Sequence, residues 1–201
     1  MLLAGAGQVA ASQAPTPGAP AGPPPGLVRL VIETERGDIA VTLDSAHAPR
    51  TVANFLRYVD GGFYTGGVFH RTVTPSNQPT DGVRIEVIQG AANPVRQAPE
   101  FPAIELEPTS ATGLKHLEGT ISMARAGPNT ATSDFFICIG DQPALDFGGR
   151  RNPDGQGFAA FGRVTSGMSV VRAIQRSAAQ GQRLTPPVRI RRIRRATDRV
   201  G

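Results

Sequence analysis

The sequence predicts a mainly β protein, folded as a closed antiparallel β-barrel of about eight strands and capped by two α-helices. Most apolar residues fall in short runs separated by turn-forming residues, and the 201-residue chain carries 24 glycines and 18 prolines. Only two stretches show the spacing of an amphipathic helix. Many short strands with two helices far apart in the chain are typical of a barrel closed at its ends.

The first predicted elements are a hairpin and a helix. Residues 27–33 form an apolar run, Gly37 marks a turn, and residues 38–43 alternate apolar with polar side chains. Pro49 suits the first turn of a helix, and the glycine pair 61–62 ends it. The apolar face of this helix consists of Val52, Phe55, Leu56 and Val59.

Further strands are predicted from short apolar runs along the rest of the chain. These runs are residues 68–69, 85–88, 120–124, 135–139 and 158–164. A second helix is predicted over 169–178, and Val188, Ile190 and Ile193 indicate a last strand. Residues 74–85 and 146–157 are rich in turn formers and are predicted to be loops. Loops of this length in a compact domain are either functional or neutral insertions.

Residues 1–26 are predicted to be a disordered arm, which leaves 27–201 as the folded domain. The arm consists largely of Ala, Gly and Pro and carries no charge, so it cannot bury enough surface to fold alone. Residues 11–14 resemble a signal cleavage site, but no positive residue precedes the apolar run. If residues 1–14 are the remainder of a signal, the protein is periplasmic or secreted. If they are a plain arm, it is cytoplasmic.

The charge and cysteine content exclude several classes of protein. The formal charge is +5, but the densest basic run, residues 189–195, is not interleaved with aromatics. It therefore indicates a solvated strand rather than a nucleic-acid site, with an acidic partner as the alternative. Cys138 is the only cysteine, so an internal disulfide is impossible and no Cys/His set has zinc spacing. We predict no metal or other cofactor, and no apolar stretch approaches the ~18 residues of a membrane span.

Four segments carry a resemblance to a known family. They are residues 64–71, 87–90, 121–130 and 133–137, flanked by a helix at 48–55 and a strand at 161–164. In this order they closely resemble the cyclophilin-type peptidyl-prolyl cis-trans isomerases, from residue 27 to the end of the chain. The resemblance implies a cyclophilin-like barrel and an enzyme that isomerises X–Pro bonds in proline-containing polypeptides, assists folding and needs no cofactor. We expect it to act as a monomer.

The chemistry of this reaction defines what its site must contain. Rotation about a peptide bond faces a barrier of ~18–20 kcal/mol, and unaided X–Pro exchange takes ~10–100 s. The twisted transition state gives the proline nitrogen a lone pair, so a catalyst needs a donor there and an apolar seat for the ring. The resemblance implies that Arg71 is the donor and that Gln89 orients it and binds the substrate backbone. The alternatives are a surface salt-bridge arginine and a glutamine that caps a strand.

The resemblance also implies the substrate-binding residues. Phe136 forms the floor of the proline pocket and Phe158 a wall, while Phe69 and Phe135 belong to the core. His70 is a structural residue, because isomerisation moves no proton; His47 and His116 have no partner visible in the sequence. The other pocket and backbone-binding positions are Val87, Leu145, Ala124, Arg125 and Ala126.

Several positions depart from the family pattern, among them Arg125, Asp134 and Ala144. Asn is common where Arg125 stands, a change that binding through the backbone should survive. Gln is common where Asp134 stands, and we hypothesise that Asp134 pairs partly with Arg71 or selects basic substrates. A tryptophan that helps relatives bind cyclosporin is absent, with Ala144 nearest its place, which predicts weak cyclosporin binding.

Two other functions remain as alternatives. A non-catalytic module that binds proline peptides, or acts as a chaperone-like holder, would keep Phe136 but could lose Arg71 or Gln89. Both are present, which favours the enzyme. An interaction domain that uses its arginine-rich face on an acidic partner would show strong salt dependence of binding.

Overall fold

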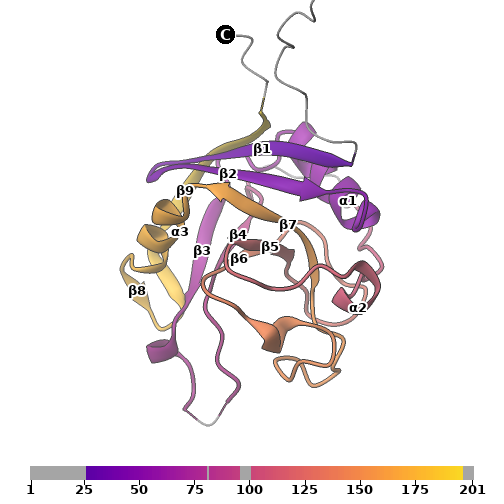
Figure 1. Ribbon diagram of the computed structural model, residues 1–201. Coiled ribbons are helices and arrows are strands. Elements are labelled where there is room, and N and C mark those ends of the chain that lie inside the picture. Colours follow the sequence, from indigo (N-terminus) through magenta and orange to yellow (C-terminus); the bar gives the residue numbers. More distant parts are fainter. Residues whose placement is uncertain (1–25, 81, 96–100, 197–201) are drawn as a thin grey trace, which may run out of the picture.

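A computed structural model describes residues 26–80, 82–95 and 101–196, which form a closed antiparallel β-barrel (Figure 1). The strands run in the order β1-β2-β7-β5-β6-β4-β3-β9, and β1 pairs with β9 to close the barrel. The short β8 pairs only with β9. The strands are β1 Leu27–Thr34, β2 Gly37–Asp44, β3 Val68–Val73, β4 Val87–Ala91, β5 Thr120–Met123, β6 Phe135–Cys138, β7 Ala159–Ser166, β8 Ala179–Gln180 and β9 Arg183–Arg195.

The predicted fold class is therefore confirmed. The first hairpin joins β1 to β2 in a register that pairs Thr34 with Gly37. Gly37 has φ +122°, a conformation that side chains with a Cβ rarely adopt, so glycine is needed at this turn. The predicted arm, apart from Gly26, lies outside the described residues.

Two helices cover opposite sides of the barrel (Figure 1). Helix α1, Pro49–Asp60, begins at the predicted proline, ends before Gly61 and buries Val52, Phe55 and Val59. Helix α3, Met168–Gln175, ends earlier than predicted, because the chain turns into β8 at Ala179. The structure adds three single turns that were not predicted: η1 Pro75–Asn77, α2 Thr109–Thr112 and η2 Pro143–Leu145.

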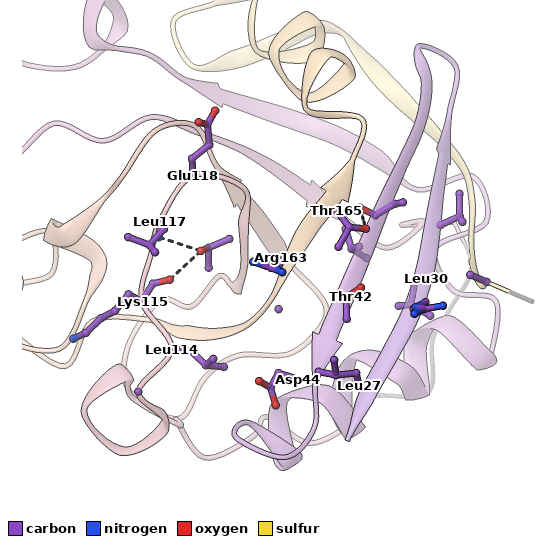
Figure 2. A pocket seen from close by; sticks show the side chains of 18 residues that line it. Leu27, Leu30, Thr42, Asp44, Leu114, Lys115, Leu117, Glu118, Arg163 and Thr165 are labelled. Atoms are coloured by element: carbon purple, nitrogen blue, oxygen red, sulfur yellow. Dashed lines mark hydrogen bonds between the residues drawn. The ribbon is translucent and has the colours of Figure 1, made fainter. Parts of the chain in front are cut away.

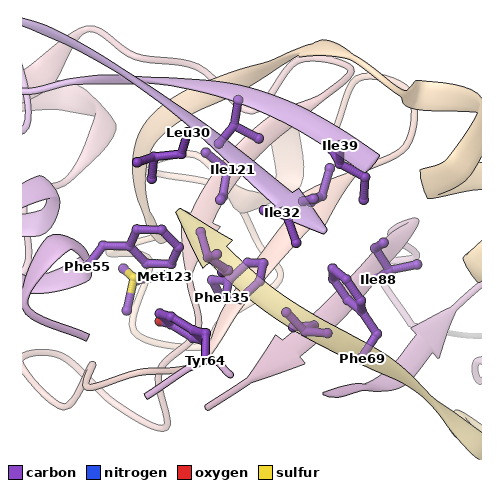
Figure 3. Packing of buried hydrophobic residues seen from close by; sticks show 14 of the residues in the cluster. Leu30, Ile32, Ile39, Phe55, Tyr64, Phe69, Ile88, Ile121, Met123 and Phe135 are labelled. Atoms are coloured by element: carbon purple, nitrogen blue, oxygen red, sulfur yellow. The ribbon is translucent and has the colours of Figure 1, made fainter. Parts of the chain in front are cut away.

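The barrel interior is filled by aliphatic and aromatic side chains from the strands and from α1 (Figure 3). Phe55 of α1 packs into this interior, with the ring centres of Tyr64, Phe135 and Phe161 between 5.1 and 5.4 Å from its own. Phe69 and Phe135 are fully buried, as predicted for core residues. Tilted and edge-to-face ring packing of this kind stabilises a core beyond simple burial.

The arginine-rich run lies on β9, and three of its five arginines bind carboxylates within the chain. From Val188 to the end of β9, every buried residue is apolar, whereas the arginines point outward. Arg192 and Arg194 both donate to the Glu33 carboxylate on β1, and Arg195 pairs with Asp60 at the end of α1. The hydrogen bonds from Arg192 and Arg194 lower the pKa of Glu33 to about 2. The run therefore fastens the seam where β1 meets β9.

Two observations concern a membrane span and a reactive cysteine. Within residues 26–80, 82–95 and 101–196, no helix has the length and apolar character required to cross a bilayer. Cys138 is buried in β6, where burial raises the pKa of its thiol far above the ordinary value. A protonated thiol of this kind is a poor nucleophile.

Candidate active site

Strand register brings the predicted catalytic residues together. Arg71 on β3 lies opposite Gln89 on β4, and Gln89 lies opposite Phe136 on β6. A register shift between Phe69 and Arg71 interrupts the ladder, so Phe69 faces the core while Arg71 is half-buried beside a cavity. Three neighbouring strands thus present a cation, an amide and an aromatic ring side by side.

Arg71 is held from two sides by neutral amides. Its Nη1 donates to Gln89 Oε1 at 3.0 Å, and its Nε and Nη2 donate to Gln182 Oε1 at 2.9 and 2.6 Å. Gln182 is held in turn, because its Nε2 donates to the Asn77 carbonyl and its own carbonyl accepts from Thr72 N–H. The clamp orients the guanidinium without neutralising it. Sequence reasoning missed Gln182, which lies 111 residues from Arg71 between β8 and β9.

The cavity beside Arg71 measures about 230 Å³. An apolar cluster separate from the main core forms its floor, with Phe136, Val87 and Leu145 buried. The Phe158 ring meets the Phe136 ring edge-on at 5.3 Å. The predicted residues that line the cavity are Arg71, Val87, Gln89, Ala124, Arg125, Phe136, Leu145 and Phe158.

Two of the predicted substrate-binding residues do not line this cavity. Asp134 Oδ2 accepts a hydrogen bond from Gln89 Nε2 at 3.3 Å, so Gln89 lies between Asp134 and Arg71. The hypothesised pairing of Asp134 with Arg71 is thus replaced by contact through Gln89. Ala126 lies in a turn, where its N–H donates to Thr130 Oγ1 at 3.1 Å.

A buried polar network supports the floor from below. His116 Nδ1 lies 2.8 Å from Asp146 Oδ1, and its Nε2 lies 3.0 Å from Ser122 Oγ. The imidazole stacks on Phe136 with 5.9 Å between ring centres. Burial lowers the pKa of His116, which favours the neutral ring. Ser122 is fully buried, so this Ser-His-Asp set cannot reach a substrate and instead holds Phe136 in place.

His116 thus has partners that the sequence did not reveal, because Asp146 is 30 residues away and comes close only through the fold. His70, expected to be structural, is half-buried, and burial lowers its pKa. Groups of three or more His, Cys, Asp or Glu that could hold a metal are absent from the described part of the chain.

The Arg125 side chain fastens the 146–157 loop to the pocket. Its Nη1 and Nη2 donate to the two carboxylate oxygens of Asp154 at 2.8 and 2.9 Å, and its Nε donates to the Gly157 carbonyl. The guanidinium lies 5.1 Å from the Phe158 ring centre and is almost fully buried. These bonds lower the pKa of Asp154 to about 2. A residue predicted to act through its backbone therefore also orders a wall of the site.

A larger cavity, about 790 Å³, lies elsewhere (Figure 2). It is lined by β1, β2 and β7 and by the segment 113–120. Its charged side chains, such as Asp44, Lys115 and Glu118, lie apart from one another rather than converging on one point (Figure 2). The smaller cavity is the better catalytic candidate, because its polar groups meet beside an apolar seat.

The site places an oriented cation beside an apolar pocket, on the wall of a closed β-barrel. This arrangement defines a class of enzyme that can rotate a proline peptide bond without a covalent step. Residues 29–195 match the sequence model of the family "Cyclophilin type peptidyl-prolyl cis-trans isomerase/CLD". The chain belongs to this family, and its activity is the cis-trans isomerisation of X–Pro peptide bonds.

Individual relatives agree with this assignment. The chain is 37% identical over 142 residues to "Peptidyl-prolyl cis-trans isomerase A" of Dickeya dadantii, covering 70% of this chain and 67% of that protein. It is 35% identical over 145 residues to "Peptidyl-prolyl cis-trans isomerase cyp18" of Streptomyces antibioticus, covering 72% and 81%. The fold matches the crystal structure of a Cryptosporidium parvum cyclophilin type isomerase with a TM-score of 0.68 and 21% identity, over 86% of this chain and 99% of that one.

Proposed function

We propose that Arg71 accelerates X–Pro isomerisation by donating a hydrogen bond to the proline nitrogen of the twisted transition state, while the proline ring sits on Phe136. The observation that carries this proposal is the clamp on Arg71 at the edge of the apolar cavity. Three of the five guanidinium N–H groups are used by Gln89 and Gln182, which leaves one on each terminal nitrogen.

The proposed hydrogen bond is selective for the transition state. In the planar ground state the proline nitrogen shares its lone pair with the carbonyl and is a poor acceptor. Rotation restores the lone pair, so the bond to Arg71 strengthens only as the peptide twists. An interaction made only in the transition state raises the rate, by tenfold for each ~1.4 kcal/mol.

The rest of the site holds the substrate. Gln89 uses its oxygen for Arg71 and one N–H for Asp134, which leaves one N–H for a substrate carbonyl. We propose that the main chain of Ala124, Arg125 and Ala126 pairs with the peptide, which tolerates varied side chains. The substrates are proline-containing polypeptides during folding, on exported chains if residues 1–14 are a signal remnant and in the cytoplasm otherwise.

The monomeric state and weak cyclosporin binding belong to the same proposal. Each barrel strand is paired on both sides, so the barrel offers no free edge to a second copy. Ala144 packs against the apolar cluster of the pocket where relatives have a tryptophan, and it offers a cyclic peptide little contact.

The test is NMR exchange spectroscopy on a short X-Pro-Phe peptide. We expect Arg71→Ala to lose about 100-fold in kcat/KM, the usual effect of removing one transition-state donor. Arg176→Ala, which removes an exposed arginine from the end of α3, is the matched control and should keep full activity. A folded wild-type protein that binds the peptide without accelerating exchange would establish the non-catalytic binding module instead.

A further inference from the structure

A second arginine lines the proposed proline pocket. Arg151 and Asn152 belong to the 146–157 loop, and both line the cavity that holds Arg71 and Phe136. The Arg151 N–H donates to the Ala144 carbonyl at 3.1 Å, which fixes its backbone against the pocket cluster. The family motifs given above do not include this position.

The Arg151 side chain links the two loops that were predicted from composition. Its Nη1 donates to the Val83 carbonyl at 2.8 Å and lies 3.5 Å from Gln78 Oε1, both in the 74–85 loop. Figure 1 shows the two loops at the same end of the barrel, away from the C-terminus. Gln78 is itself fixed, because its amide bonds to both Thr74 and Ile85. Arg151 is thus held in a defined place at the cavity.

Within the part of the chain that the structure describes, no carboxylate compensates the charge of Arg151. No Asp or Glu oxygen among the described residues lies within 4.0 Å of it, and its side chain bonds through Nη1 to neutral groups. Arg125 differs, since Asp154 neutralises it with two bonds. Arg71 is held only by amides. Two guanidinium charges therefore face one small cavity, and the pKa of Arg71 is lowered first by burial and further by the charge of Arg151.

Asn152 adds a donor that the protein leaves unused. Its Nδ2 is buried and has no hydrogen-bond partner among the described residues, although Asn152 lines the cavity. An unsatisfied buried donor costs free energy, about 1–3 kcal/mol in typical cases, and an acceptor supplied by a ligand would recover it once the Asn152 side chain rotates to expose Nδ2 to the cavity. Beside two arginines, the acceptor that fits best is an anionic or carbonyl oxygen.

We propose that Arg151, together with Asn152, makes the pocket select X–Pro segments that carry an acidic side chain next to the proline. The free Nε and Nη2 of Arg151 form the planar fork that matches a carboxylate, and Asn152, after its side chain rotates toward the cavity, donates to a neighbouring substrate oxygen. This proposal rests on the isomerase function of the pocket and assigns it a substrate class. A preference for acidic substrates is the opposite of the preference for basic substrates that Asp134 would produce.

The test compares Glu-Pro, Gln-Pro and Lys-Pro peptides of otherwise identical sequence, and the same three residues placed after proline. We expect the wild-type protein to favour the Glu peptide over the Gln peptide by about tenfold in kcat/KM at low salt, at one of the two positions, and by less at high salt. Arg151→Gln removes the charge but keeps a donor for Val83, and it should abolish the preference. Arg150→Ala is the control, because Arg150 is exposed, adjacent and absent from the cavity.

Each alternative outcome is informative. Equal rates for Glu and Gln peptides at both positions, or an equal loss of preference in Arg150→Ala, would overturn the assignment to Arg151. A preference for Lys that disappears in Asp134→Gln would assign selectivity to Asp134 instead. If the wild-type protein accelerates no peptide, the catalytic proposal fails, but NMR titration with the same peptides still measures whether Glu binds more tightly and whether Arg151 is the cause.

Discussion

Gln182 Oε1 accepts two hydrogen bonds from Arg71, at 2.9 Å from Nε and 2.6 Å from Nη2. The two residues join the catalytic strand β3 to the turn between β8 and β9. A hydrogen bond from the Thr72 N–H to the Gln182 carbonyl reinforces this connection. Gln89 alone would restrain only one edge of the guanidinium. With Gln182 on the other edge, the plane of the guanidinium is fixed before substrate arrives.

Gln182 is therefore predicted to be a positioning residue. We expect Gln182→Ala to lower kcat about tenfold with little change in KM, because two hydrogen bonds that orient the donor are lost while the pocket remains. Gln182→Glu keeps an oxygen acceptor and should recover part of the loss. Gln180→Ala, an exposed neighbour, is the control. A rise in KM without a fall in kcat would assign Gln182 to substrate binding.

The Arg125–Asp154 pair is predicted to order the 146–157 loop. Replacing Arg125 by Asn, the residue common in relatives, removes the two bonds to Asp154 and the contact over Phe158. We expect hydrogen exchange of loop amides to speed up by roughly tenfold or more, since local opening becomes easier. Mass spectrometry of exchange would measure this, with strand β2 as an internal reference. Unchanged loop protection would show that the other loop contacts suffice.

The sequence predicts the site best where two residues lie on adjacent strands. The order of the motifs brings Arg71, Gln89 and Phe136 onto neighbouring strands. Strand alternation alone would put Phe69 and Arg71 on the same face, and only the register shift between them, seen in the fold, turns Phe69 to the core. Gln182 could not be predicted, because its contact depends on how the β8–β9 turn folds back. The partners of His116 were missed for the same reason, as no local pattern relates it to Asp146.

The loops show a second limit of the sequence. Their composition predicts turns but does not state which charges meet, so the pairing of Arg125 with Asp154 and the placement of Arg151 became visible only in the fold. Helix α3 ends at Gln175, three residues before its predicted end at residue 178. The tertiary pairing of β8 with β9 overrides the local preference predicted from the sequence.

Stability should depend on the protonation of His116. Burial lowers its pKa below 6.5, so the unfolded chain binds more protons as the pH falls through 6.5 and the free energy of unfolding decreases. We expect the urea midpoint to fall between pH 7.5 and pH 5.5, and His116→Gln to reduce that slope. His70, whose pKa is also lowered, supplies the remainder. A slope that is unchanged in His116→Gln but lost in the exposed His47→Gln would contradict this.

Ala144 provides a gain-of-function test for cyclosporin. We expect the wild-type protein to bind cyclosporin weakly, and Ala144→Trp to tighten the dissociation constant about tenfold by adding aromatic contact area and an indole donor. Calorimetry would measure both, with Ala144→Leu as a control for added bulk. A nanomolar dissociation constant for the wild-type protein would contradict the prediction.

The seam between β1 and β9 should be sensitive to acid through Glu33. Its pKa is about 2 in the folded protein, against 4.5 ordinarily, because Arg192 and Arg194 donate to it. A lowered carboxyl pKa contributes stability that is present above about pH 4.5 and is lost as the pH falls towards 2. We therefore expect Glu33→Gln to be less stable than wild type at pH 7, with the difference shrinking as the pH falls from 4.5 to 3.

Urea denaturation at each pH would measure this difference, with Glu35→Gln as the control, since Glu35 is exposed just beyond β1. High salt should weaken the effect, because the Arg192–Glu33 and Arg194–Glu33 pairs lie at the surface. A difference that stays constant from pH 7 to pH 3 would mean that Gln disturbs packing rather than charge. In that case the arginine-rich strand would close the barrel by its apolar face and backbone bonds alone.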